Sequence, residues 1–95
     1  MKMRLPDHVT LTPADPEPDD GGRPNAAVLL DERTGRYYHL NPTAHLIVAG
    51  LLEGATPAEA AARLVAVYPG AADRADDDTH QLIAHLTGAG LLERR

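Results

Sequence analysis

The chain has 95 residues, no cysteine and a formal net charge of −5, a size that supports one small hydrophobic core. The absence of cysteine excludes disulfides, a thiolate nucleophile and a thiolate metal site. The acidic balance disfavours nucleic acid as a partner, because nucleic-acid binders gain most of their affinity from lysine and arginine contacts to phosphate. We therefore expect a single domain over residues 1–95 that binds a neutral or basic partner.

The first half of the chain has the pattern of a small antiparallel sheet. Residues 5–13 alternate in polarity and predict a first edge strand that Pro13 closes. Residues 12–25 hold four prolines, two glycines and four acidic residues, a composition that predicts a mobile loop. The runs "AAVLLD" and "RYYHL" then predict a hairpin, with Gly35 in its turn at positive φ. Together these segments predict a three-stranded antiparallel sheet.

After residue 40 the hydrophobic period changes from 2 to about 3.6, which predicts helices. Asn41 can cap a first helix that ends before Gly54. The interior of this helix is apolar on almost every side, so we expect the helix to be buried. The run "TPAE" at 56–59 is a capping box that begins a second helix, and Pro69 ends that helix.

A third helix is predicted over residues 73–89, and the residues after Gly90 are expected to follow it without regular structure. A small sheet followed by three helices is an α+β, winged-helix-like order of elements. That topology hosts both nucleic-acid binders and peptide binders, so the fold by itself does not decide the function. One face of the third helix would carry Ala75, Thr79, Leu82, Leu86 and Ala89.

The histidines and hydroxyls do not form a recognisable catalytic or metal site. His80 and His85 lie about 140° apart around a helix and cannot share a ligand face. Asp76 and His80 have usable spacing, but two ligands do not complete a zinc or iron site. The chain has no serine, and its threonines fall at predicted caps or strand ends. We expect no enzymatic activity, no metal and no cofactor.

Two kinds of large partner are disfavoured. The third helix opens "DRADDD" and would bring four carboxylates toward the phosphates of DNA. These acidic side chains either only complement the positive end of the helix dipole or also bind a partner, and the sequence leaves both explanations open.

No signal peptide is recognisable, and no stretch approaches the roughly 18 apolar residues of a membrane span. The sequence thus predicts a cytoplasmic protein that binds neither nucleic acid nor membrane.

Two adjacent tyrosines stand on the last predicted strand, and neighbours on a strand point to opposite faces of the sheet. One explanation is structural, with one ring in the core and the other covering the sheet. The other is that the strand is an exposed edge beside the third helix, where an extended peptide adds a strand. Because Leu40 is the best core candidate, alternation predicts that Tyr38 faces inward and Tyr37 faces the peptide.

The segment that contains "GRYYHLNPT" and "GATPAEAAARL", followed by a helix ending "LTGAGLL", resembles the PqqD-like leader-binding domains of ribosomal peptide pathways. It is most similar to the small stand-alone form found in lasso-peptide biosynthesis. The resemblance covers about residues 5–92, although the acidic loop at 12–25 departs from the compact turn expected of the family.

This resemblance implies a non-catalytic domain that binds the leader of a precursor peptide and presents it to separate enzymes. In that family the leader lies antiparallel to the third strand and against the third helix. The implied partners are a leader peptidase of the cysteine-protease type and an ATP-dependent lasso cyclase. A DNA-binding winged-helix regulator and a structural subunit that completes an enzyme are the alternatives. The implied peptide-binding residues are Arg36, Tyr37, Tyr38, His39 and Leu40 on the strand, and Asp76, Asp78, Thr79, Leu82, Ile83 and Leu86 on the helix.

Overall fold

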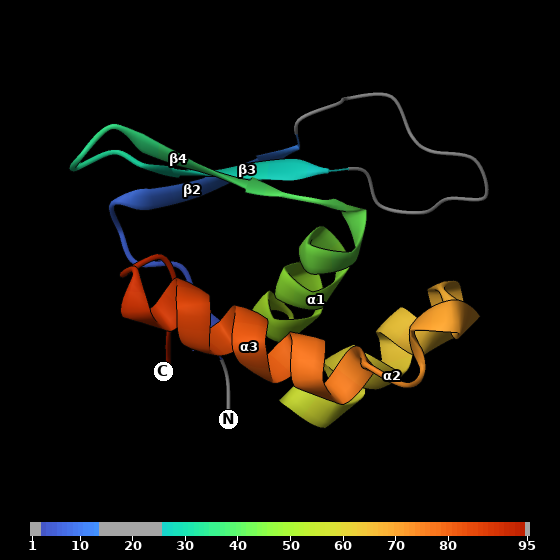
Figure 1. The fold of residues 1–95 in the computed structure, drawn as a ribbon. Coiled ribbons are helices and arrows are strands. Elements are labelled where there is room, and N and C mark those ends of the chain that lie inside the picture. The colour runs from blue at the N-terminus through green and yellow to red at the C-terminus, as the bar shows by residue number, and fades with distance from the viewer. Residues whose placement is uncertain (1–2, 14–25, 95) are drawn as a thin grey trace.

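The computed structural model describes residues 3–13 and 26–94. A three-stranded antiparallel sheet lies over three helices, the α+β arrangement that the sequence predicts (Figure 1). The sheet has the order β2-β3-β4, so β4 is an edge strand. Its strands are β2 (Val9–Pro13), β3 (Ala27–Asp31) and β4 (Arg36–Leu40), and the helices are α1 (Pro42–Leu52), α2 (Pro57–Val67) and α3 (Ala75–Gly88), with the 3₁₀ turn η2 (Pro69–Ala71) before α3.

The first strand extends into the segment that was predicted to be a loop. Thr12 and Pro13 pair with Val28 and Ala27, because the ladder between β2 and β3 continues to the end of β2. β2 ends at Pro13, as predicted for the first strand, so Thr12 and Pro13 are strand residues and do not belong to the predicted loop. The rest of the predicted mobile loop, residues 14–25, lies outside the described residues.

Hydrogen bonds of Asp31 stabilise the turn of the hairpin between β3 and β4. Gly35 has a φ of 75°, as the sequence predicts, and its N–H donates to the Asp31 carbonyl at 2.7 Å. The Asp31 carboxylate accepts the backbone N–H of Arg33 at 3.0 Å. Burial acts to raise the pKa of Asp31, but this bond, bonds from Thr34 and the nearby His8 together hold it below the ordinary value.

The first two helices begin at the predicted caps. The backbone N–H of Ala44 donates to Asn41 Oδ1 at 2.8 Å, which starts α1 directly after β4. Thr56 and Glu59 satisfy each other's backbone N–H groups at the start of α2, which confirms the capping box. Gly54 follows α1 with a φ of 106°. The turn from β4 into α1 is therefore set by local hydrogen bonds.

The end of α3 is a Schellman motif that directs the chain back into the core. Gly90 has a φ of 76°, and the N–H of Leu91 donates to the carbonyl of Leu86 at 2.9 Å. Leu91 and Leu92 are both buried. The expectation of no regular structure after Gly90 is wrong, because β5 (Glu93–Arg94) pairs with β1 (Met3–Arg4).

The core lies between the inner face of the sheet and the helices. Val48 and Leu51 of α1 are fully buried, which confirms that α1 is the buried helix. The sheet contributes Leu29 and Leu40, while α2 packs against both α1 and α3. In the described part of the chain, no helix is both long and apolar enough to cross a lipid bilayer.

Candidate binding groove

Two hollows lie in a row where β4 and the start of α1 face α3. The larger, of about 620 Å³, lies between the start of α1 and the first half of α3, and we call it the α1-end hollow. The second, of about 540 Å³, lies between the β3–β4 hairpin and the end of α3, and we call it the hairpin hollow. The two hollows together are called the groove.

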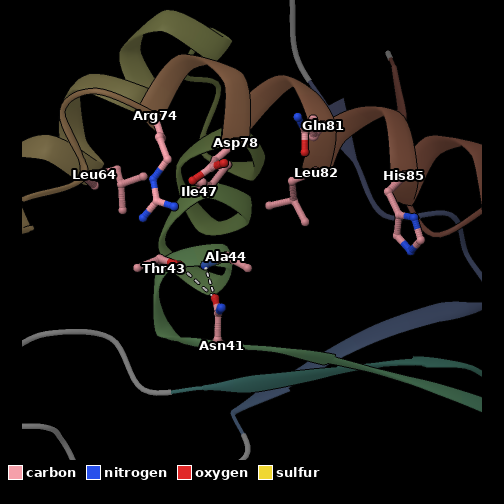
Figure 2. Close-up of a pocket in the computed structure, with 11 residues that line it drawn as sticks. Asn41, Thr43, Ala44, Ile47, Leu64, Arg74, Asp78, Gln81, Leu82 and His85 are labelled. Carbon is pink, nitrogen blue, oxygen red and sulfur yellow. Dashed lines mark hydrogen bonds between the residues drawn. The ribbon is translucent and has the colours of Figure 1, made fainter.

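The α1-end hollow has an apolar floor and a polar rim. Figure 2 shows side chains of α3 and of the residue before it directed toward the start of α1. Ala44, Ile47 and Leu82 supply apolar surface, so the hollow can accept an apolar side chain. The polar lining groups are Asn41, Thr43, Arg74, Asp78, Gln81 and His85.

A ring contact separates the two hollows. Tyr38 of β4 and His85 of α3 meet edge to face, with ring centroids 5.4 Å apart and an interplanar angle of 62°. Tyr38 is half-buried and packs against the core, which confirms that it faces inward. The same ring also lines the hairpin hollow, so one tyrosine belongs both to the core and to the groove.

The hairpin hollow is bordered by two arginines. Arg33 and Arg36 are exposed, and neither forms an ion pair with another described residue. Tyr38, Ala89 and Leu91 supply the apolar part of the lining. This end of the groove is therefore positively charged beside an apolar surface.

Tyr37, which was predicted to face the peptide, lines neither hollow of the groove. Tyr37 is 65% exposed and lies on the opposite face of the sheet, where it lines an apolar hollow of about 480 Å³ with Thr12, Val28, Leu30 and the exposed His39. The hairpin register pairs Tyr38 with the buried Leu29 and so directs Tyr37 outward. Tyr37 and Tyr38 lie on opposite faces, as alternation predicts, and the groove lies on the inner side of β4, which faces α3.

The residues predicted on the third helix divide between groove and core. Asp78 and Leu82 line the α1-end hollow. Thr79 and Leu86 are fully buried beneath the helix and do not reach the groove. Ile83 packs against the core, and the exposed Asp76 lines neither hollow.

In the α1-end hollow, three lining residues on or beside α3 were not predicted: Arg74, Gln81 and His85. Together with Asp78 and Leu82 they form one stripe at helical spacing, and this periodicity could have identified them. Asn41 and Thr43 could not be found in this way. They reach the groove only because the chain turns directly from β4 into α1.

The backbone of β4 offers a second kind of binding surface. This strand pairs with β3 on one side and ends the sheet on the other. Half of the N–H and C=O groups of an edge strand point away from the sheet and can pair with an added strand. Since Arg36 lies near Ala89 and Asn41 lies near Asp78, β4 and α3 run in opposite directions along the groove.

The histidines and acids of the described residues do not gather into a candidate metal site of three or more groups. His80 Nδ1–H donates to the Asp76 carbonyl at 2.8 Å, a bond within the helix. The arrangement in the groove therefore favours binding through shape, apolar contact and backbone pairing.

Comparison with known proteins adds independent information. The family model described as Coenzyme PQQ synthesis protein D (PqqD) matches residues 26–92. A solved structure described as lasso peptide synthetase B1 complexed with the leader peptide is 33% identical, with a TM-score of 0.77 over 99% of this chain and 100% of that chain. TbiB1 in complex with the TbiA(beta) leader peptide is 26% identical, with a TM-score of 0.72 over 100% of this chain and 98% of that one. No curated protein sequence matches the chain.

Proposed function

The chain belongs to the PqqD family, and from that premise we propose that it binds the leader segment of a ribosomally made precursor peptide in lasso-peptide biosynthesis. The similarity to two proteins that are each complexed with a leader peptide carries this proposal. The groove beside an edge strand supports it independently, because that geometry suits an extended peptide.

The leader adds a strand antiparallel to β4 and packs against α3. Alternate leader side chains point toward α3 and enter the hollows on either side of the contact between Tyr38 and His85. Backbone pairing along the five residues of β4 contributes about 1 kcal/mol net for each hydrogen bond. With one or two side-chain anchors, this gives micromolar to submicromolar affinity, which corresponds to roughly 8 kcal/mol or more.

The chemistry of the leader is performed by other proteins in this proposal. A leader peptidase of the cysteine-protease type and an ATP-dependent lasso cyclase act on the precursor that the groove presents. The chain contains neither cysteine nor serine, and His85 in the groove contacts an aromatic ring. These observations support a role in binding.

The alternative of a DNA-binding regulator has less support. The first turn of α3 exposes Asp76, Asp77 and Asp78, and helix recognition would place these carboxylates against phosphates. The other alternative, a subunit that completes an enzyme, predicts a stable complex with that enzyme even when no precursor is present.

Calorimetric titration tests the proposal. We expect the leader of the precursor to bind and its core segment alone to show no binding. Leu82→Asp should weaken leader binding by at least about tenfold, because it places a charge in the apolar floor of the α1-end hollow. Ala62→Asp, on an exposed position of α2, is the matched control and should bind like the parent. Equal affinity for leader and core would contradict the proposal.

A further inference from the structure

The arginines of this chain are unevenly partnered. The described residues include six, and Arg4 and Arg63 form ion pairs with glutamates at 3.0 and 3.2 Å. Of the four with no ion pair to another described residue, three line the groove: Arg33 and Arg36 in the hairpin hollow, and Arg74 in the α1-end hollow. The net charge of the chain is −5, so three arginines without ion pairs in one groove indicate a site for a negatively charged group.

Asp31, the carboxylate that lines the hairpin hollow, forms no ion pair with Arg33 or Arg36. Asp31 is only 7% exposed, and its Oδ1 accepts the backbone N–H of Arg33 at 3.0 Å. The imidazole of His8 also lies near Asp31 Oδ1, with its Nε2 3.9 Å away. The guanidinium groups of Arg33 and Arg36 therefore remain available to a ligand.

The α1-end hollow differs in charge. Arg74 shares that hollow with Asp78, so positive and negative groups border it together. An anionic side chain gains less there than in the hairpin hollow, where the acidic lining residue is buried and hydrogen-bonded. The two ends of the groove consequently favour different side chains.

We propose that the hairpin hollow binds a carboxylate side chain of the leader peptide, held by Arg33 and Arg36. This inference rests on the proposed function. A guanidinium matches a carboxylate in a planar, two-bond geometry that gives orientation as well as attraction. The leader is thus anionic at this position, unlike the neutral or basic partner that the net charge of the chain leads us to expect.

The direction of the added strand gives the position of this acid. A leader antiparallel to β4 has its N-terminal part near Asn41 and its C-terminal part near the hairpin. Positions opposite Leu40 and Arg36 face the same side and are about four residues apart, because the side-chain period of a strand is two. The acid therefore lies about four residues after the side chain that enters the α1-end hollow, on the side of the core peptide.

Selection from a displayed library of random peptides tests this assignment. The baits are the parent chain, the variants R33E/R36E and R33Q/R36Q, and the control Arg94→Glu. Arg94 is exposed and lies outside the groove, so its variant has the same charge change per residue at an unrelated site. Thermal melts of all four proteins establish that they are folded.

We expect the parent and Arg94→Glu to enrich peptides with Asp or Glu at one fixed place. R33E/R36E should enrich Lys or Arg at that place, and R33Q/R36Q should show no charge preference there. For one enriched peptide, replacing its acid by the neutral amide should weaken binding to the parent about tenfold, equivalent to 1.4 kcal/mol. The same change should leave binding to R33Q/R36Q unaltered.

Two other outcomes separate the possible failures. If the parent enriches peptides whose binding is lost in Leu82→Asp, but all baits select the same residues, the carboxylate assignment is overturned and leader binding stands. If no enriched peptide depends on Leu82, the proposed function itself fails, and the inference fails with it.

Discussion

Tyr38 and His85 show how two residues can join a sheet to a helix while leaving space on both sides of their contact. Their rings meet edge to face at 5.4 Å, where β4 and α3 face each other. Tyr38 also packs against the core, so its position is fixed before any ligand arrives. A leader strand would therefore meet a rigid aromatic surface, which lowers the entropy lost on binding.

Substitution of the two tyrosines distinguishes their roles. Tyr38→Ala should lower stability by about 2 kcal/mol, less than the 3 to 5 kcal/mol of a fully buried aromatic, and should also weaken leader binding. Tyr37→Ala should melt and bind like the parent, because its ring is 65% exposed on the other face of the sheet. Thermal melts and fluorescence-polarisation titrations measure both effects. Loss of leader binding in Tyr37→Ala alone would show that the peptide lies on the outer face instead.

At the scale of elements, α3 provides one wall of the groove and also ends in the turn that closes the core. Its groove stripe and its buried stripe lie side by side, and Leu82 stands where they meet. The Schellman motif at its end bonds the Leu91 N–H to the Leu86 carbonyl, and both leucine side chains are buried in the core. The position of the groove wall therefore depends on this helix end.

Two glycines at the end of α3 should respond in opposite directions to the same substitution. Gly90→Ala should destabilise the protein by about 1 kcal/mol, because a φ of 76° is unfavourable for residues with a Cβ atom. Gly88→Ala should stabilise it by up to about 1 kcal/mol, since Gly88 is helical and a Cβ there meets no atom within 4 Å. Urea unfolding curves provide the comparison. Equal destabilisation by both changes would argue against the cap as described.

At the scale of the whole molecule, the two ends of the described chain pair with each other in a two-stranded sheet. The antiparallel pair of β1 and β5 aligns Met3 with Arg94 and Arg4 with Glu93, and an ion pair of 3.0 Å joins the side chains of the second couple. Met3 and Leu92 are buried at this junction. The strand pair contacts α1 through β1, and Met3, Leu91 and Leu92 belong to the core cluster.

This pairing predicts a large effect of a substitution close to the end of the chain. Leu92→Ala should cost 2 to 5 kcal/mol, roughly the cost of removing a fully buried leucine side chain, which is a large part of the stability of a small domain. Arg94→Ala, two residues away and exposed, should change stability by less than about 0.5 kcal/mol. Circular dichroism melts of the two variants test this difference. A Leu92→Ala protein as stable as the parent would show that the two-stranded pairing contributes little.

Local features of the fold and part of the groove follow from the sequence alone. The cap at Asn41, the capping box at Thr56 and the turn at Gly35 each depend on side-chain and backbone chemistry within a few residues. The hydrophobic periods likewise predicted the sheet and the three helices, and the family motifs lie within these elements. Strand alternation also placed Tyr38 inward, because that argument needs only the neighbouring core residue.

Features that depend on contacts between distant segments were decided only by the tertiary structure. The short strands β1 and β5 carry no periodic signal, since two residues form a strand only when a partner from the other end of the chain lies beside them. The side of β4 that becomes the groove depends on where α3 packs, so alternation could place Tyr38 inward but could not show that the inner side of β4 also borders the groove. Arg33, Arg36 and Tyr38 likewise join Ala89 in one hollow only because α3 crosses beneath the hairpin.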